Sequence, residues 1–336
     1  MRPRISLNVG RIRVVHISEG FSREVGLSES SFRSSRSVEG LPLIWGISVT
    51  PPRTLTVSMS RKQKPKLGQN FLTDNRARHA IVDALGDLFN RTVVEIGPGH
   101  GSLTEILATR AHRLIAVELD PSLAAELTFR LRNHPNVRIH QADILKTDLA
   151  TLLELEGESP ETQPNGFDVI GNLPYNITSD ILLKHFATSL TAPHKRAVLM
   201  MQREVADRVS ALPGIRDYGM LSATTGMYAE VQNLFTLPPT AFSPPPDVHS
   251  TVLRLEFAPR FAELEVDPPG FTRFLRICFA QTRKTLANNL RAGGFPPASI
   301  AQAVHQASPA SVSPLARAET ITLEGMAELY RALRIA

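Results

Sequence analysis

The 336-residue chain is long enough for two domains, and its 42% apolar residues predict a substantial hydrophobic core. The formal net charge is +5, but the eight Arg and four Glu of residues 1–58 contribute +4 of it, so net charge alone does not argue for nucleic-acid binding. The sequence has no run of eighteen apolar residues, a single cysteine (Cys278) and no His cluster at metal-ligand spacing. These features exclude a disulfide framework, and we expect a cytoplasmic protein without membrane span or metal.

Residues 1–58 show no sustained hydrophobic period and contain eleven Ser, eight Arg and no Lys. Such a composition occurs in organelle transit peptides, although the four Glu argue against one. We expect a disordered tail, or upstream sequence translated from a start codon placed too early. In the second case the functional protein begins at Met59, and a chain of residues 59–336 retains its function.

Between residues 91 and 257, short apolar segments alternate with segments of helical period. The expected strands are "TVVEIG", "RLIAVEL", "VRIHQ", "FDVIGN" and "RAVLMMQ". Several are apolar throughout, as in strands that helices cover on both faces. The expected helices span 102–110, 121–133, 178–189 and 203–212. This alternation predicts an α/β fold with a mostly parallel sheet between helices.

Two further strand candidates follow in the sequence, "VQNLFTL" and "HSTVLRLEF". The proline-rich loop "PPTAFSPPPD" between them is short, which favours an antiparallel pair at the sheet edge. Residues 258–269 are typical of a linker, and 270–336 are helical in pattern. We therefore expect an α/β domain over residues 59–262 and a small α-helical domain over 263–336.

The segment "VVEIGPGHGSLT" has the pattern of a strand, a glycine-rich turn and a helix start. Gly97, Gly99 and Gly101 permit a tight turn and a close approach of ligand to backbone. A dinucleotide fingerprint requires a third glycine at position 102, where Ser102 stands, so the spacing argues against a nicotinamide-dependent dehydrogenase. The spacing E-x-G-x-G-x-G is that of class I methyltransferases, which use S-adenosylmethionine; a plain turn is the alternative.

Two carboxylates follow the next two expected strands. Glu118 ends the second strand, about twenty residues after the glycine turn, where an acid can accept both ribose hydroxyls of a nucleoside cofactor. Asp143 follows the third strand, where it can accept from the exocyclic amine of the cofactor's adenine. Either acid alone could instead be a helix cap or a solvated turn residue, and Asp120, which precedes Pro121, is a better cap candidate than Glu118.

The fourth strand ends on Asn-Leu-Pro-Tyr. Two acceptors that hold the hydrogens of an adenine amine favour a pyramidal nitrogen whose lone pair faces a methyl donor. The side-chain carbonyl of Asn172 is one acceptor, and the backbone carbonyl of Leu173, kept extended by Pro174, is the other. Tyr175 offers a flat face for a base that has left its stack. The alternative is a structural turn capped by tyrosine.

The chain resembles the KsgA family of ribosomal RNA adenine dimethyltransferases from about residue 64 to its end. The resemblance is carried by "KLGQNFLTD", "VEIGPGHGSLT", "AVELD", "GNLPYNIT", "LMMQREVADRV", "YGMLS", "FSPPPDVHS" and "QTRKTLANNL". It implies S-adenosylmethionine-dependent transfer of two methyl groups to each of two adjacent adenosines in the 3′-terminal hairpin loop of 16S rRNA, within an immature ribosomal small subunit. By position, it also implies cofactor-site roles for Asn70, Leu72, Gly97, Glu118, Asp143 and Asn172, and target-base roles for Asn172, Leu173 and Tyr175.

Residues 270–291 predict a helix with a basic face. Its exposed positions are Arg273, Arg276, Arg283, Lys284 and Arg291, and its apolar positions are Phe271, Phe274, Leu275, Cys278, Phe279, Leu286 and Leu290. A basic face is commonly only a solvated one. Next to a base-methylating site, however, Arg276, Arg283 and Lys284 are candidates for RNA phosphate contacts.

Three other functions fit parts of the pattern. A methyltransferase of the macrolide-resistance type shares "QNFL" and the Asn-x-Pro-Tyr motif but acts on large-subunit RNA; Leu173 and "TRKTL" favour the small-subunit group. DNA adenine methylation usually needs a recognition domain larger than the residues after 263 supply. A ribosome-assembly factor could keep the fold without catalysis, and the joint presence of Glu118, Asp143 and Asn172 argues against it.

Overall fold

The computed structural model describes residues 70–158, 166–192, 194–307, 313 and 315–335. It also describes two short strands, β1 (Ile5–Asn8) and β2 (Arg11–Val14), which pair antiparallel inside a separate N-terminal unit. The rest of the first 58 residues, and with it the expected tail or early start, lies outside the described residues. That expectation stays a prediction.

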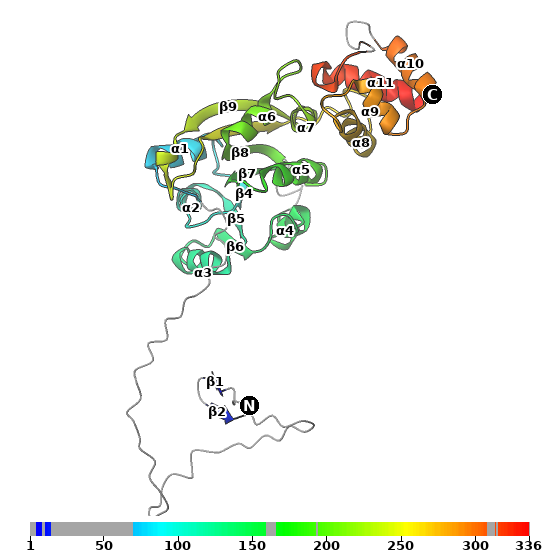
Figure 1. Cartoon of the computed structure of the whole chain (residues 1–336). Helices are drawn as coiled ribbons and strands as arrows, with labels where there is room; N and C mark the ends of the chain where they lie inside the picture. The colour runs from blue at the N-terminus through cyan, green and yellow to red at the C-terminus, as the bar shows by residue number, and fades with distance from the viewer. Residues whose placement is uncertain are drawn as a thin grey trace, which may run out of the picture. The chain divides into compact units, whose positions relative to one another are not determined.

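A seven-stranded sheet forms the centre of the unit that follows (Figure 1), in the order β6-β5-β4-β7-β8-β11-β9. Its strands are β4 (Thr92–Ile96), β5 (Arg113–Glu118), β6 (Val137–Gln141), β7 (Phe167–Asn172), β8 (His194–Gln202), β9 (Ala229–Leu237) and β11 (Ser250–Phe257). The first five are parallel, and β11 pairs antiparallel with both β8 and β9. The predicted α/β class and the predicted antiparallel pair are therefore confirmed.

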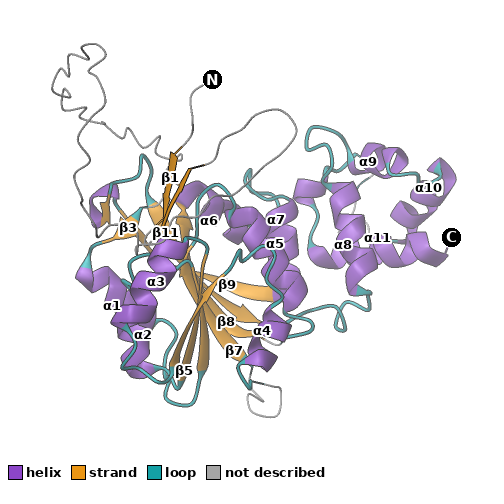
Figure 2. Ribbon diagram, turned by 90° about the horizontal axis from the view of Figure 1, so that it is seen from below, coloured by secondary structure: helices purple, strands orange, loops and turns teal. Residues whose placement is uncertain are grey.

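Helices cover both faces of this sheet (Figure 2). One face carries α1 (Asn75–Asp83), α2 (Thr104–Arg110) and α3 (Pro121–Arg130), and the other carries α4 (Leu149–Leu155), α5 (Thr178–Thr188), α6 (Arg203–Ser210) and α7 (Met220–Tyr228). Successive strand residues point to opposite faces, so Val93 lies in one hydrophobic cluster and Val94 in the other. This double cover explains why the strands are apolar throughout.

Helix α3 shows how local sequence fixes an element boundary. The Asp120 carboxylate accepts hydrogen bonds from the backbone amides of Ser122 and Leu123, and Pro121 occupies the first helical turn, where its missing N–H costs nothing. The prediction that Asp120 rather than Glu118 caps a helix is confirmed. Glu118 is thereby left for another role.

The C-terminal residues that the structure describes form four α-helices, α8 (Pro268–Cys278), α9 (Leu286–Ala292), α10 (Pro297–Gln306) and α11 (Leu323–Ile335). The predicted single helix over 270–291 is wrong, because α8 ends at Cys278 and α9 begins only after a turn. Asn289 is buried and its side-chain Nδ2 donates to the backbone carbonyls of Cys278 (2.7 Å) and Gln281 (3.1 Å). These bonds satisfy carbonyls that a continuing helix would have used.

The predicted division of faces in this region nevertheless holds. All seven residues of the expected apolar side are buried: Phe271, Phe274, Leu275, Cys278, Phe279, Leu286 and Leu290. The five basic residues are exposed. The larger hydrophobic cluster runs without a break from the sheet into these helices, as Leu253 and Met326 both belong to it. The domain boundary at 262/263 stays a prediction.

A buried pair of histidines joins α5 to β8. His194 Nδ1 lies 2.7 Å from the backbone carbonyl of Ala192 and therefore carries the proton, so its Nε2 accepts from His185 Nδ1 at 3.0 Å. Burial lowers the pKa of His194 to about 4. Burial also lowers the pKa of His185 well below its ordinary value, with smaller contributions from the neighbouring His194 and Lys184.

We expect this pair to make the protein less stable as pH falls from about 6.5 towards 4, because the histidines gain protons in the unfolded chain before they do so in the folded one. Each contributes up to about 1.4 kcal/mol of unfolding free energy per pH unit. The measurement is urea unfolding between pH 5 and 7.5, for wild type and for the double variant His185→Leu/His194→Leu, whose curve should rise less steeply with pH.

The comparison with the variant is needed because Glu95 acts in the opposite direction. Burial raises the pKa of Glu95 to about 8, so its contribution to stability is lost as pH rises through the same range. The exposed His305 offers a matched control, since His305→Leu should leave the slope as in wild type. Parallel curves for wild type and the double variant would contradict the assignment.

No helix within the described ranges is long and apolar enough to cross a membrane.

Candidate active site

The site is built at the carboxyl ends of β4, β5 and β7, beginning with the glycine turn between β4 and α2. Gly97 has φ +64° and its amide donates to the carbonyl of Val117 at 2.9 Å, which extends the β4–β5 ladder by one residue. A Cβ built on Gly97 would meet no described atom closer than the backbone carbonyl of Asn172, at 4.0 Å. The turn therefore leaves open space beside the end of β7.

Glu118 stands at the end of β5 with only 3% of its surface exposed. Its Oε2 accepts from the amide of Gly99 at 3.0 Å, and its Oε1 accepts from the amide of Asp120 at 2.8 Å. The carboxylate is thus fixed against the glycine turn, and the structure brings together these two sequence-predicted features.

Asn172 ends β7 with its amide held from one side. Its Nδ2 donates to the backbone carbonyl of Asn70 at 2.9 Å. Because a carbonyl can only accept, this contact fixes the orientation of the amide and turns Oδ1 away from Asn70. That Oδ1 is buried and has no hydrogen-bond partner among the described residues. An unpaired buried acceptor is costly, so it marks a place for a donor.

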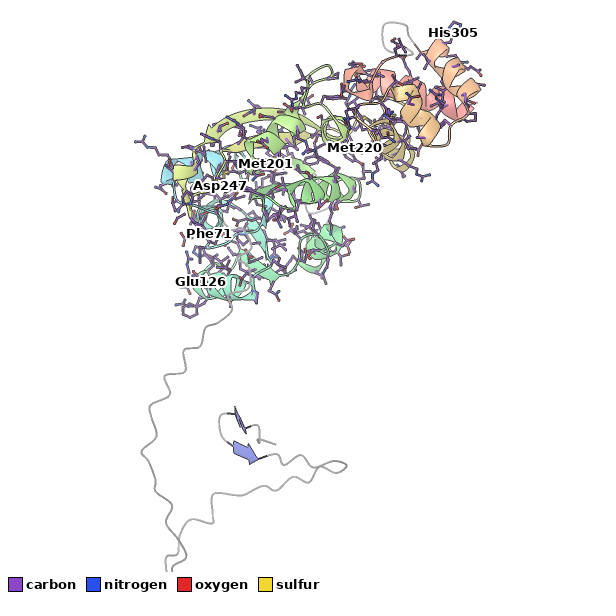
Figure 3. The ribbon with its side chains drawn as sticks, viewed as in Figure 1. Phe71, Glu126, Met201, Met220, Asp247 and His305 are labelled. Atoms are coloured by element: carbon purple, nitrogen blue, oxygen red, sulfur yellow. The ribbon has the colours of Figure 1, made fainter. Side chains whose placement is uncertain are left out.

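The residue after Asn70 lies against the glycine turn; it is Phe71, which Figure 3 labels. Strand β3 (Phe71–Leu72) pairs with β10 (Phe242–Ser243). The ring of Phe71 occupies the space that a side chain on Gly99 would need, at 2.9 Å from an added Cβ. Leu72 is 2% exposed and packs in the core, so it anchors this strand.

Leu173 and Tyr175 follow Asn172 on the way to α5. The Leu173 amide donates to the carbonyl of Met200 at 2.9 Å, and its side chain is buried. Tyr175 is half-buried, and its hydroxyl lies 2.6 Å from Ser250 Oγ. Burial raises the pKa of the Tyr175 phenol, although the hydrogen bond to Ser250 acts in the other direction, so the phenol stays neutral at ordinary pH.

Ser250 is the site residue that the sequence reasoning missed. It stands inside the quoted stretch "FSPPPDVHS", but nothing in that motif indicates a contact with a residue 75 positions earlier. No signal in the sequence alone could have found it.

Asp143 follows β6, the neighbour of β5, and is 30% exposed at its side chain. Its Oδ1 accepts from the amide of Leu145 at 3.0 Å, and its Oδ2 lies 3.6 Å from Lys146 Nζ. The carboxylate therefore stabilises its own turn, as the alternative interpretation expected. A contact with a cofactor's adenine stays a prediction.

The three RNA candidates lie in the C-terminal helical region. Arg276 is exposed on α8, while Arg283 and Lys284 are exposed in the turn between α8 and α9. This turn, residues 280–284, lines a hollow of about 520 Å³. Within the described part of the chain, no group of His, Cys, Asp and Glu could hold a metal ion.

A parallel sheet completed by one reversed strand, with a glycine turn after β4 and an acid after β5, defines a class I methyltransferase. The family model for ribosomal RNA adenine dimethylase matches residues 60–331. The chain belongs to this family.

Individual relatives agree with that membership. The chain is 52% identical over 284 residues to the ribosomal RNA small subunit methyltransferase A of Acidobacterium capsulatum, covering 84% of this chain and 96% of the relative. It is 50% identical to the protein of the same name from Koribacter versatilis, covering 81% and 95%.

Solved structures resemble it at lower identity. The 23S rRNA methyltransferase ErmE is 26% identical, with a TM-score of 0.56, 79% of this chain and all of that chain being covered. A dimethyladenosine transferase from Plasmodium falciparum is 22% identical with a TM-score of 0.60, covering 77% of this chain and 95% of that one, and supports the fold alone.

Proposed function

We propose that this protein transfers methyl groups from S-adenosylmethionine to the N6 atoms of two adjacent adenosines in the 3′-terminal hairpin loop of 16S rRNA. The observation that carries the proposal is the buried, unpaired Oδ1 of Asn172 at the end of β7, a residue whose backbone carbonyl borders the open space at Gly97. An acceptor fixed at this position suits an amine donor, and an exocyclic adenine amine is such a donor.

The residues at the strand ends fit S-adenosylmethionine. Gly97 leaves room for the cofactor, Glu118 accepts its ribose hydroxyls, and Asp143 accepts from its adenine amine. Leu72 belongs to strand β3, whose Phe71 ring lies against Gly99, and Asn70 directly precedes that strand. When bound, the cofactor supplies an electrophilic methyl group on a sulfonium.

The end of β7 prepares the target amine for attack. Asn172 Oδ1 and the backbone carbonyl of Leu173 accept its two hydrogens, which favours a nitrogen whose lone pair is free. Tyr175 supports the base on its ring face after the base leaves its stack. No protein base is required, because the methylated nitrogen can lose its proton to water.

The small ribosomal subunit is the proposed substrate because the relatives at 52% and 50% identity carry that name. The similarity to a 23S rRNA methyltransferase is weaker, at 26% identity. We further propose that the protein acts in the cytoplasm on immature subunits, where the hairpin loop is still accessible. A non-catalytic assembly role is the less favoured candidate, since the site retains its acceptor.

The experiment that tests this function is methyl transfer from radiolabelled S-adenosylmethionine to small and large subunits that lack these methyl groups. The modified nucleoside is then identified after digestion of the rRNA. We expect N6,N6-dimethyladenosine from the small subunit. Label confined to the large subunit would support the macrolide-resistance type instead, and no label from an intact chain would favour the assembly role.

The exposed residues Arg276, Arg283 and Lys284 are proposed to contact rRNA phosphates. We expect the triple change to Gln to weaken RNA binding and to flatten its salt dependence, by roughly one unit of log–log slope for each phosphate that is no longer neutralised. The fold should survive because all three side chains are exposed, and because Gln is a good helix former at Arg276, the one of the three that lies in a helix. The measurement is small-subunit rRNA affinity at several salt concentrations.

A matched control removes the same charge elsewhere. Arg110, Arg132 and Arg138 are exposed on the half of the sheet unit that contains α2 to β6, and their triple change to Gln should leave the salt slope near that of wild type. If both triple variants flatten the slope equally, general charge rather than a defined contact surface accounts for RNA binding.

A further inference from the structure

The hydroxyl contact between Tyr175 and Ser250 joins the target-base end of β7 to β11, which lies two strands further along the sheet. Tyr175 lies in the turn between β7 and α5 and is only half-buried. Ser250 is fully buried at the start of β11, where its backbone is in register with Gln202 on one side and Leu237 on the other. A turn residue is thus tied by its outermost atom to a strand that is paired on both sides.

The effect of such a tie on a tyrosine ring follows from its geometry. Two side-chain torsions place the ring, and at an exposed turn both can vary. A hydrogen bond at the far end of the ring, 2.6 Å long, restricts the first torsion and so fixes where the ring axis points. The hydroxyl oxygen lies on the axis of the second torsion, so the bond favours one ring plane only because a phenolic O–H prefers to lie in the plane of its ring. The ring is then held in one place, with one plane favoured, before any base arrives, which reduces the entropy lost when the base stacks on it.

We propose that Ser250 is a positioning residue for methyl transfer: it holds the Tyr175 ring in the orientation that receives the target adenine. The inference rests on the proposed function, since it assigns to Tyr175 the support of the flipped base. It also requires the Tyr175 hydroxyl, which base stacking alone does not require. A flat ring face is kept by Tyr175→Phe, so stacking without the tie predicts that this variant is fully active.

The experiment is a double-mutant cycle on the full chain with Tyr175→Phe, Ser250→Ala and the combined variant. The readouts are kcat and KM for methyl transfer to small subunits, cofactor affinity, and thermal unfolding. We expect each single change to lower kcat by about three- to tenfold, which is the value of one neutral hydrogen bond expressed as a rate. The combined variant should be no slower than the slower single one, because both remove the same bond, and cofactor affinity should be unchanged.

The neighbouring residue on β11 offers a matched control. Thr251 is also fully buried, points to the other face of the sheet, and its hydroxyl pairs with that of Thr236 on β9 at 2.9 Å. Thr251→Ala therefore removes a hydroxyl pair in which a fully buried β11 residue bonds a more exposed partner, as Ser250 does, with a similar cost in stability, and we expect its kcat to match wild type. A merely structural role for Ser250 would make the two alanine variants behave alike.

Two outcomes would overturn the proposal, and they are distinguishable. If wild type makes dimethyladenosine while Tyr175→Phe or Ser250→Ala keeps full kcat, or if their losses multiply in the combined variant, the tie does not position the ring and only this inference fails. If wild type itself transfers no methyl group to the small subunit, the proposed function fails and the inference fails with it.

Discussion

Replacing Asn172 by alanine is expected to slow methyl transfer by about 10²–10³-fold, the loss seen when one preorganised hydrogen-bonding group is removed from an active site. The reason is that the Asn172 amide is fixed in orientation. Its Nδ2 donates to the Asn70 carbonyl, and its buried Oδ1 is left to accept from the target amine. Affinity for S-adenosylmethionine should fall less, since Asn172 only borders the space proposed for the cofactor. The measurements are single-turnover methyl transfer and equilibrium cofactor binding.

Asn136 provides the control for this change. Its side-chain Nδ2 also donates to backbone carbonyls, those of Ala108 and Ala111, but it lies far along the chain from β7. Asn136→Ala should lower the unfolding temperature and leave the turnover of the folded protein intact. Near-normal turnover in a folded Asn172→Ala protein would remove Asn172 from the proposed mechanism.

A second large effect is expected at Glu118. Glu118→Ala should weaken the binding of S-adenosylmethionine by about 10²-fold or more, because two hydrogen bonds to a charged acceptor are lost, each contributing about 1.5–3 kcal/mol. The change also frees the amide of Gly99, so the glycine turn becomes less ordered. Glu118→Gln keeps an acceptor and should fall between alanine and wild type. Isothermal titration with the cofactor measures all three.

A change at Asp120, two residues after Glu118, tests whether the loss of cofactor affinity is specific to Glu118 or follows from losing any negative charge there. Asp120 caps α3, so Asp120→Ala should cost about 1 kcal/mol of stability and little cofactor affinity. If the two alanine variants lose cofactor affinity equally, the ribose does not bind at Glu118.

The sequence predicted the sheet well because double cover makes its strands apolar from end to end, as in β4. It did not indicate α7, whose residues are almost all buried, since a helix covered on every side has no amphipathic period. It also failed at the end of α8, where a buried amide from Asn289 replaces the helical hydrogen bonds. Periodicity cannot detect a capping group supplied from outside the helix.

The site shows the same limit. Glu118 and the glycine turn were predictable because both are set by position at the ends of neighbouring strands. The contact between Asn172 and Asn70 spans 102 residues, and that between Tyr175 and Ser250 spans 75, so no local pattern could reveal either. Sequence motifs predicted the site residues at the end of β7, whereas only the structure revealed the distant residues that orient them.

The pairing of β3 with β10 has a consequence for synthesis. Leu72 lies opposite Phe242, and the amides of Thr73 and Asp74 both donate to the carbonyl of Ala241. The strand that follows Asn70, the residue that orients Asn172, is thus kept in place by a segment some 170 residues downstream, and closing so long a loop comes late in folding. While the chain is still emerging from its ribosome, the contact between Asn172 and Asn70 therefore cannot be held in place until β10 has been translated. The enzyme gains catalytic competence only as a nearly complete polypeptide.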